Sequence, residues 1–527
     1  MKQIQHSGRT DNVKRNISYG IMHTAVSLVL PFIVRSILIY RFGVDYLGIN
    51  SVFASVLEVL SVMELGFGTA IVYNMYKPVA AGDTGQICAY LSYYRRIYRI
   101  IGLMILAAGL IIIPFLKVLV KDSELPGSLN LYACYLIFLF NSVVSYLLYG
   151  YMNSLPLAFQ RRDILSRVDM SMAVLKCIME SMVLISSDNF YLYLLSMPLI
   201  TILRNLLTAT VTRRLYPDIT CRGKLHKEQI VDLHKRVYGL FLNKLTVNSR
   251  NGIDTICISA FISLAAAGIY SNYYIIMAGL ISVSIMICQS MMASVGNSIV
   301  TESRDKNYTN MRSFDFIYMT VAGWATVCLI CLYQPFISLW LGDGMKLGLN
   351  VVLGLCLYFY ILKAGDIRWV FHEGVGLWYE CRFITIGETI ANLVLNILLC
   401  SVWGIAGIVY ATVITVFVTN MLLFPEILFR IYFRNGKLRE YWTDHLKYFF
   451  TTVVGAVPAY LLCSGLDRVT VLITDHDVNA VVGGISLLVL KLLICTASFT
   501  MVFLSIWRRS GRYKNAVQWI RRLTAKT

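Results

Sequence analysis

The chain has 527 residues, of which 57% are hydrophobic and 14% are charged, whereas a soluble domain has roughly 25% charged residues. This composition excludes an ordinary soluble enzyme, because so few charged residues cannot cover a core that would hold so many apolar ones. A net charge of +18 would suggest nucleic-acid binding in a soluble protein. In a membrane protein, this charge must first be divided between the two sides of the bilayer.

Apolar runs predict an all-α membrane protein with about fourteen spans. A hydrocarbon core of about 30 Å is crossed by roughly 20 helical residues. Runs of this length lie at about 17–40, 46–76, 97–120, 129–152, 170–186, 190–212, 237–262, 268–299, 314–339, 347–364, 383–402, 404–431, 446–464 and 480–507. A count of twelve, with re-entrant or interfacial segments around 366–378, stays open.

The basic residues predict an orientation. If the N-terminus is cytoplasmic, most of the 47 Lys and Arg residues fall in cytoplasmic connections, and the outer side holds only Arg41, Lys117, Lys121, Lys346 and Arg468. The positive-inside rule predicts this asymmetry, which a single missed helix would destroy. We therefore expect both termini in the cytoplasm. The outer connections are too short to hold a catalytic domain.

Two similar motifs predict internal symmetry. Tyr46-Leu-Gly-Ile-Asn-Ser51 opens the second span, and Ala266-Ala-Gly-Ile-Tyr-Ser271 opens the eighth. An offset of six spans preserves orientation, so we expect parallel repeats about an axis along the membrane normal, as in alternating-access transporters. Two six-helix lobes would then surround a central cavity. The expected segments are an N-terminal lobe at 1–212, a basic cytoplasmic connection at 213–236, a C-terminal lobe at 237–431, two appended spans at 432–507 and a basic tail at 508–527.

Charged residues inside the predicted spans are candidates for function. A charge at membrane depth costs at least about 2.5 kcal/mol on insertion scales, so it should face water or a partner. The spans contain the cations Arg35, Lys176, Arg204, Lys244, Arg250 and Lys491, and the acids Glu58, Glu64, Glu180, Asp254 and Glu388.

An arginine suits a phosphate, because its planar guanidinium donates two parallel hydrogen bonds and stays protonated. Arg35 and Arg250 are therefore the first candidates for binding an anionic head group, with Asn243, Lys244 and Arg204 beside them. Near the cytoplasmic end of a span, snorkelling to the interface is the alternative for a basic residue.

A carboxylate that alternates between environments can take up and release a proton or bind a cation. Glu58, Glu64, Asp254 and Glu180 are therefore predicted to serve ion coupling. Structural alternatives stay open. Arg250 with Asp254, and Lys176 with Glu180, are spaced to form i,i+4 ion pairs, and Glu64 precedes Leu65-Gly-Phe-Gly68, where glycines allow a kink.

Several short sequences extend over the first twelve spans. They are Tyr46–Ser51, Met63-Glu-Leu-Gly-Phe-Gly-Thr-Ala70, Tyr76-Lys-Pro78, Gln334-Pro-Phe-Ile-Ser-Leu-Trp-Leu-Gly342, Asn392-Leu-Val-Leu-Asn396 and Gly404-Ile-Ala-Gly407. Together they resemble the Wzx-type polysaccharide flippases of the multidrug/oligosaccharidyl-lipid/polysaccharide (MOP) exporter superfamily.

The resemblance implies two lobes with a V-shaped cavity, in the bacterial cytoplasmic (inner) membrane. It implies translocation of an undecaprenyl-diphosphate-linked oligosaccharide to the outer leaflet, for the biosynthesis of O-antigen and lipopolysaccharide, capsule or exopolysaccharide. A cation-lined cavity for the diphosphate suits Arg35 and Arg250. The implied partners are the lipid-linked glycan, membrane lipids and other polysaccharide-assembly proteins. No cofactor is expected; the sequence has no GxxxxGK[ST] loop, so an H⁺ or Na⁺ gradient would drive the cycle.

Two alternatives remain. A cation-coupled multidrug exporter of the same superfamily would have an acidic, apolar cavity. A membrane polysaccharide polymerase or glycosyltransferase would need acids or a histidine on an outer loop; Asp475-His-Asp477 is the one such cluster, and we interpret it as a solvated turn.

Cys328 and Cys331 form a CxxC sequence within an apolar run. Because no second pair lies nearby in the sequence, a metal or redox role is not expected.

Overall fold

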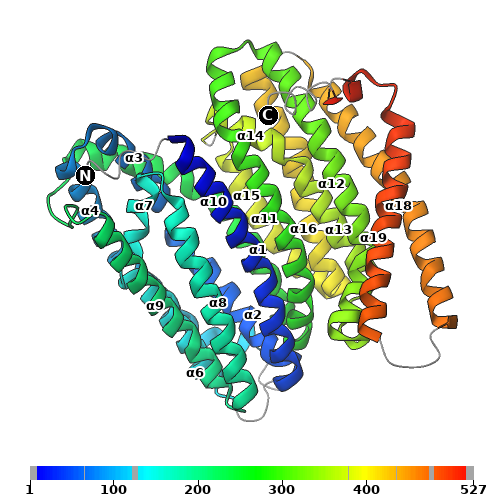
Figure 1. Ribbon diagram of the computed structural model, residues 1–527, viewed down its shortest axis with the longest axis horizontal. Helices are drawn as coiled ribbons and strands as arrows, with labels where there is room; N and C mark the ends of the chain where they lie inside the picture. Colours follow the sequence, from blue (N-terminus) through cyan, green and yellow to red (C-terminus); the bar gives the residue numbers. More distant parts are fainter. Residues whose placement is uncertain are drawn as a thin grey trace. The chain divides into compact units, whose positions relative to one another are not determined.

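The computed structural model describes residues 9–64, 66–120, 129–377, 379–434, 436–473, 480–514 and 516–517. Throughout these ranges every regular element is helical (Figure 1), which confirms the predicted all-α class. The chain divides into two compact units, Met1–Ser271 and Asn272–Thr527. The predicted turn at Asp475 to Asp477 lies outside the described residues.

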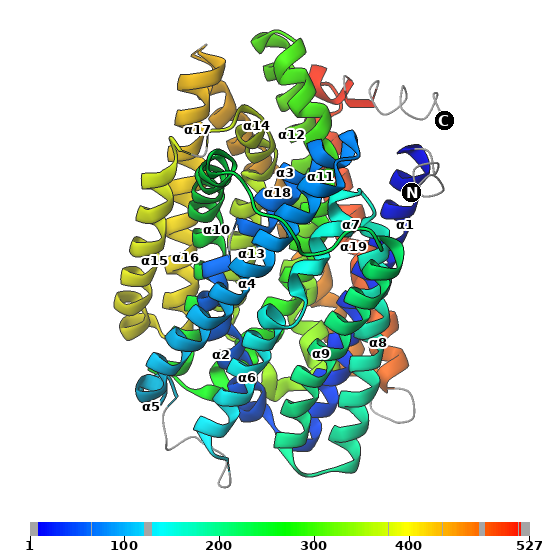
Figure 2. The same cartoon turned by 90° about the vertical axis from the view of Figure 1, so that its left-hand side faces the viewer.

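The described residues of the first unit form ten complete α-helices and the beginning of an eleventh. They are α1 (Arg9–Phe42), α2 (Val44–Leu60), α3 (Phe67–Ala81), α4 (Thr84–Ile112), α5 (Leu116–Leu119), α6 (Leu131–Leu147), α7 (Ser154–Ala158), α8 (Arg162–Ser186), α9 (Phe190–Leu215), α10 (Lys227–Phe261) and α11 (Leu264–Thr301). Here α1 packs along α8, and Figure 2 shows α9 beside both α6 and α8.

The second unit continues from α11. Its helices are α12 (Arg304–Leu341), α13 (Leu349–Ala364), α14 (Asp366–Val375), α15 (Arg382–Trp403), α16 (Ile405–Phe417), α17 (Phe424–Leu428), α18 (Leu438–Ile473) and α19 (Ala480–Trp507). Two π-helical turns, Val418–Leu423 and Phe429–Phe433, flank α17. In Figure 1, α12, α18 and α19 lie side by side and pack on one another.

Ten described segments are long and apolar enough to cross a membrane, and α6 with α7, bent by 54°, would make an eleventh. This indicates a multi-pass membrane protein, although fourteen spans are not established. The segment near 366–378, which could have been re-entrant, is helical to Val375 and joins α13 in one candidate span, Leu349–Val375.

The predicted second span is broken in the middle. After α2, residues Ser61–Glu64 form a 3₁₀ turn. Gly66 then caps α3 with φ of 100°, a left-handed value that a residue without a Cβ adopts freely. The break places Glu64 at the junction between the two halves of the span, in agreement with the kink that the adjacent glycines suggest.

The two repeat motifs pack directly on one another. A Cβ added at Gly48 would lie 2.1 Å from the carbonyl oxygen of Leu264, and one at Gly268 would lie 2.6 Å from that of Val44. Val44 and Leu264 occupy equivalent places before the two motifs, so one contact is made twice with the roles exchanged. Such reciprocity is the signature of a two-fold axis and supports the predicted internal symmetry at this crossing.

Candidate functional site

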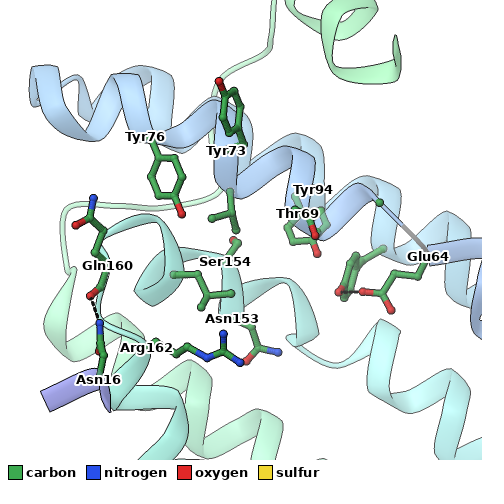
Figure 3. A pocket seen from close by; sticks show the side chains of 15 residues that line it. Asn16, Glu64, Thr69, Tyr73, Tyr76, Tyr94, Asn153, Ser154, Gln160 and Arg162 are labelled. Carbon is green, nitrogen blue, oxygen red and sulfur yellow. Dashed lines mark hydrogen bonds between the residues drawn. The ribbon is translucent and has the colours of Figure 1, made fainter. Parts of the chain in front are cut away.

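A cavity of about 700 Å³ lies within the first unit. Figure 3 shows Tyr73 and Tyr76 projecting from α3 on one side, Asn153 and Arg162 on the opposite side, and Glu64 at one end. The lining is rich in hydroxyl, amide and charged groups, so the cavity suits water and polar ligands.

Tyrosine hydroxyls surround the Glu64 carboxylate. Tyr98 donates a short hydrogen bond to Oε1, and Tyr146 interacts electrostatically with the carboxylate. Tyr94 packs edge-on against Tyr98. A Cβ at Gly68 would lie 2.8 Å from the Tyr94 hydroxyl, so glycine leaves room for this ring. Glu64 is therefore a positioned acceptor facing a cavity, which is the geometry that binding a proton or a cation requires.

The opposite wall is held in place by α1. Asn16 Nδ2 donates to the Gln160 carbonyl at 2.9 Å, and the Asp163 amide donates to Asn16 Oδ1 at 2.8 Å. Beneath this wall the Asp163 carboxylate accepts hydrogen bonds from Arg161 at 2.8 Å and from Arg167 at 2.8 Å. Burial acts to raise the pKa of Asp163, but these two arginines outweigh it and lower the pKa below its usual value.

A second cavity in the first unit, of about 340 Å³, is lined by three arginines. Arg95 and Arg99 come from one face of α4, and Arg213 comes from the end of α9. The Arg213 guanidinium lies over the Tyr149 ring, 4.7 Å from its centre. Tyr146 lines this cavity and interacts electrostatically with Glu64 of the first cavity.

These arginines are not among the site residues predicted from the sequence, because their positions place them with the cytoplasmic cations. A local signal was present: Arg95 and Arg99 are four residues apart and share a helix face, with Tyr94 and Tyr98 interleaved. Which distant residue completes the cavity cannot be inferred from spacing.

Arg35 and Glu180, to which the sequence assigned different roles, lie in one polar cluster. Arg35 Nη1 donates to Ser271 Oγ at 2.9 Å. Tyr193 interacts electrostatically with both Arg35 and Glu180, and Asn50 Nδ2 donates to the Tyr193 hydroxyl at 3.3 Å. The cluster thus joins α1, α2, α8, α9 and α11 through side chains that the predicted spans place in the membrane.

Three further charged residues of the predicted spans, Lys176, Arg204 and Glu58, lie on α8, α9 and α2. Lys176 Nζ is 3.8 Å from Glu180, which confirms the predicted i,i+4 pair. Arg204 pairs with Asp169 at 2.7 Å, so its charge already has a partner. Glu58 is exposed on the apolar helix α2. A carboxylate in that position needs water beside it.

Arg250 and Asp254 are both buried on α10. Between them, Gly252 packs against α2, where an added Cβ would lie 3.0 Å from the Ser55 carbonyl oxygen. Asn243 and Lys244 belong to the same helix, but their side chains lie outside the described residues. The roles predicted for these four residues stay predictions.

The second unit contains a buried polar row on α15. Glu388, Asn392 and Asn396 are buried at four-residue spacing. Asn392 Nδ2 donates to Thr412 Oγ1 of α16 at 3.0 Å, and Asn396 Nδ2 donates to Asn392 Oδ1 at 3.3 Å. Carboxylate, amide and hydroxyl oxygens are ligands that hard cations prefer. The spacing alone could have revealed this row.

Comparisons with known proteins identify the fold. No protein-family model and no curated protein matches the sequence. Among solved structures, the lipid II flippase MurJ in an inward closed conformation aligns with a TM-score of 0.66 and 13% identity, over 93% of this chain and 99% of the flippase. An inward-facing multidrug resistance MATE transporter of the MOP superfamily aligns at 0.60 and 15% identity, over 78% and 96%.

A MOP superfamily transporter from Pyrococcus furiosus, whose binding pocket is described as having reverse polarity, aligns at 0.57 and 12% identity, over 83% of this chain and 98% of that one. The chain therefore has the fold of the MOP superfamily transporters. These neighbours are transporters and flippases rather than enzymes.

Proposed function

We propose that the protein is a flippase that moves an undecaprenyl-diphosphate-linked oligosaccharide from the cytoplasmic to the outer leaflet of the bacterial cytoplasmic membrane, for cell-surface polysaccharide synthesis. The observation that carries the proposal is the cavity in which Arg95, Arg99 and Arg213 meet. Three guanidinium groups around one small space suit a group with two phosphates, each of which can accept paired hydrogen bonds.

The chemistry of the substrate explains why such a site is needed. A glycan head group with two phosphates does not cross hydrocarbon unaided, whereas its lipid tail can stay in the bilayer. A protein that moves this lipid therefore needs charged side chains only where it binds the head group. With the predicted orientation, the arginine cavity lies at the cytoplasmic end of α4 and α9, where the substrate would enter. Arg35 lies toward the outer end of α1, where the head group would leave.

The proposal includes ion coupling. It also includes the predicted orientation, in which both termini lie in the cytoplasm. Glu64, at the break in the second span, would exchange a proton or Na⁺ as the cavity opens and closes, and Glu58, Glu180 and Asp254 are further coupling candidates. The energy would come from an H⁺ or Na⁺ gradient, without a bound cofactor.

The rival function is a cation-coupled multidrug exporter. It is favoured by the similarity to MATE multidrug transporters. Such an exporter would use Glu64 in its tyrosine-lined cavity for the cationic drug, and it would have no use for three arginines in the neighbouring cavity. Substrate charge therefore separates the two functions.

Transport by the full chain in liposomes tests the proposal. The substrate is a lipid-diphosphate oligosaccharide with a fluorescent head group, and its translocation is measured as protection from a membrane-impermeant quencher, with and without an imposed H⁺ or Na⁺ gradient. We expect translocation by the wild type and its loss in the double variant Arg95→Gln, Arg99→Gln. Arg96→Gln, on the exposed face of α4, removes one positive charge from the same helix without touching the cavity. It is therefore the control for the loss of a single charge, and it should translocate like the wild type.

Two results would count against the proposal. Transport of a lipophilic cationic dye without translocation of the glycan lipid would identify a multidrug exporter. Normal translocation by the double variant would remove the arginine cavity from the pathway.

A further inference from the structure

Four cysteines from three helices meet inside the second unit. The Sγ atoms of Cys331 on α12, Cys463 on α18 and Cys495 on α19 all lie within 4.8 Å of one another. Cys328, one turn before Cys331, is partly buried and packs against the cluster that contains these three cysteines. In the described part of the chain, this is the one group of three or more metal-binding side chains that converges so closely.

Ordinary core packing does not require this convergence. An isolated buried cysteine behaves as a small apolar residue, and other cysteines of the chain, such as Cys134, Cys177 and Cys356, are buried on other helices. Here residues far apart in the sequence place thiols around one point.

The sulfur spacing fits a metal ion better than a disulfide. Cys463 Sγ and Cys495 Sγ are 4.0 Å apart. Four sulfurs around Zn²⁺ at about 2.3 Å are separated by about 3.8 Å along each edge of the tetrahedron. Small shifts would bring the three converging thiols to this spacing, and Cys328, which lies outside that group of three, would have to move closer to become the fourth ligand. A disulfide would instead need the two sulfurs to approach to about 2.05 Å.

The surroundings favour a bound cation over bare thiolates. Val327, Ala456, Ala459 and Phe499 pack around the thiols, and an uncompensated negative charge among apolar groups is costly. A metal ion supplies the positive charge that lets several thiols ionise together. Lys491, one turn before Cys495, is fully buried, but its Nζ pairs with Asp467 at 2.5 Å, so its charge is already compensated and does not take the place of a metal ion.

We propose that Cys328, Cys331, Cys463 and Cys495 bind one thiophilic metal ion, Zn²⁺ or Cu⁺. Each thiol that binds releases its proton to solvent and donates a sulfur lone pair to the metal, and no oxidation occurs. Cys328 is only partly buried, so it is the thiol at which the ion would enter. The bound ion joins α18 and α19 to α12 and thereby ties the last two predicted spans to the ninth. This proposal departs from the sequence-based expectation that the CxxC sequence has no metal role.

Metal content of the purified full chain tests the site. The protein is stripped of metal under reducing conditions, given Zn²⁺ or Cu⁺ in separate arms, desalted and analysed by mass spectrometry of the metal. About one ion per chain is expected in at least one arm, and less than about 0.1 is expected when all four cysteines are replaced by serine. X-ray absorption at the metal edge should show a first shell of sulfur alone.

The matched control replaces Cys134, Cys177, Cys356 and Cys400, four buried cysteines of other helices, by serine, and it should bind like the wild type. The single variant Cys463→Ser, checked for a monodisperse peak in size-exclusion chromatography, should bind more weakly than Cys356→Ser. Less than about 0.1 ion per chain in both arms with the four thiols reduced would overturn the proposal. So would a disulfide between Cys463 and Cys495, seen as a mass loss of about 2 Da without metal retention.

Discussion

Arg35 donates a hydrogen bond to Ser271 across 236 residues of sequence, with 2.9 Å between Nη1 and Oγ. The serine hydroxyl in turn donates to the Gly268 carbonyl at 2.8 Å. Ser271 closes the second copy of the repeated motif, and Gly268 makes the close crossing with the first copy. The arginine is therefore oriented by the same segment that carries the internal symmetry.

Replacing Arg35 and Ser271 in turn distinguishes the contribution of the arginine's charge from that of its orientation. Arg35→Gln should lower the initial rate of glycan translocation about 10- to 100-fold, since hydrogen bonds to charged groups are worth roughly 1.5–3 kcal/mol. Ser271→Ala keeps the charge and should give a smaller loss. Rates come from the liposome assay at equal protein content. Equal rates for Arg35→Gln and the wild type would remove Arg35 from the transport pathway.

Glu64 is predicted to couple transport to an ion gradient. Glu64→Gln keeps the shape of the side chain and removes its charge, so translocation should become insensitive to an imposed H⁺ or Na⁺ gradient. Tyr98→Phe removes the short hydrogen bond and should weaken the response, whereas Tyr73→Phe, in the wall of the same cavity, should leave it intact. A Glu64→Gln protein that still responds like the wild type would refute the role.

The crossing of the two motifs has no room for a methyl group. Gly48→Ala and Gly268→Ala should each lower stability by about 1–3 kcal/mol or more, the usual cost of overpacking, because a backbone oxygen lies in the way. Gly20→Ala is the control, since nothing lies within 4 Å of its added Cβ. Thermal unfolding in detergent measures the effect, and equal midpoints for all three variants would contradict the crossing.

Asp163 should make stability depend on pH in the acid range. Its folded pKa is lowered by Arg161 and Arg167 against the opposing effect of burial. The stabilisation is fully present above the unfolded value of about 3.9 and is lost as pH falls through the lower folded pKa. The unfolding midpoint of the wild type should therefore drop below about pH 4 more steeply than that of Asp163→Asn. Asp188→Asn, at an exposed pair with Arg41, should retain the wild-type profile.

The membrane helices and the broken second span could be anticipated from sequence because they depend on local properties. Apolar runs have to be long enough to cross the hydrocarbon, and Gly66 marks the place where the backbone needs a positive φ. The i,i+4 pair of Lys176 and Glu180 is equally local.

The partners of the site residues could not be anticipated. Tyr98 reaches Glu64 from another helix, and Asp169 neutralises Arg204 from the neighbouring α8. These contacts depend on how each helix is rotated about its axis, a quantity to which hydropathy is insensitive. The cysteine cluster could not be anticipated either, because it depends on the same helix rotations and only Cys328 and Cys331 are near one another in the sequence.

The paired contacts of Gly48 with Leu264 and of Gly268 with Val44 have the form of an isologous interface between two identical subunits. Residues 216–226 join α9 to α10. They therefore connect the part of the chain that carries the first motif to the part that carries the second. If this connection were cut, the crossing would become an intermolecular contact in which each partner offers the other the same surface. We expect two such polypeptides, produced together, to assemble through it as a pseudo-symmetric dimer.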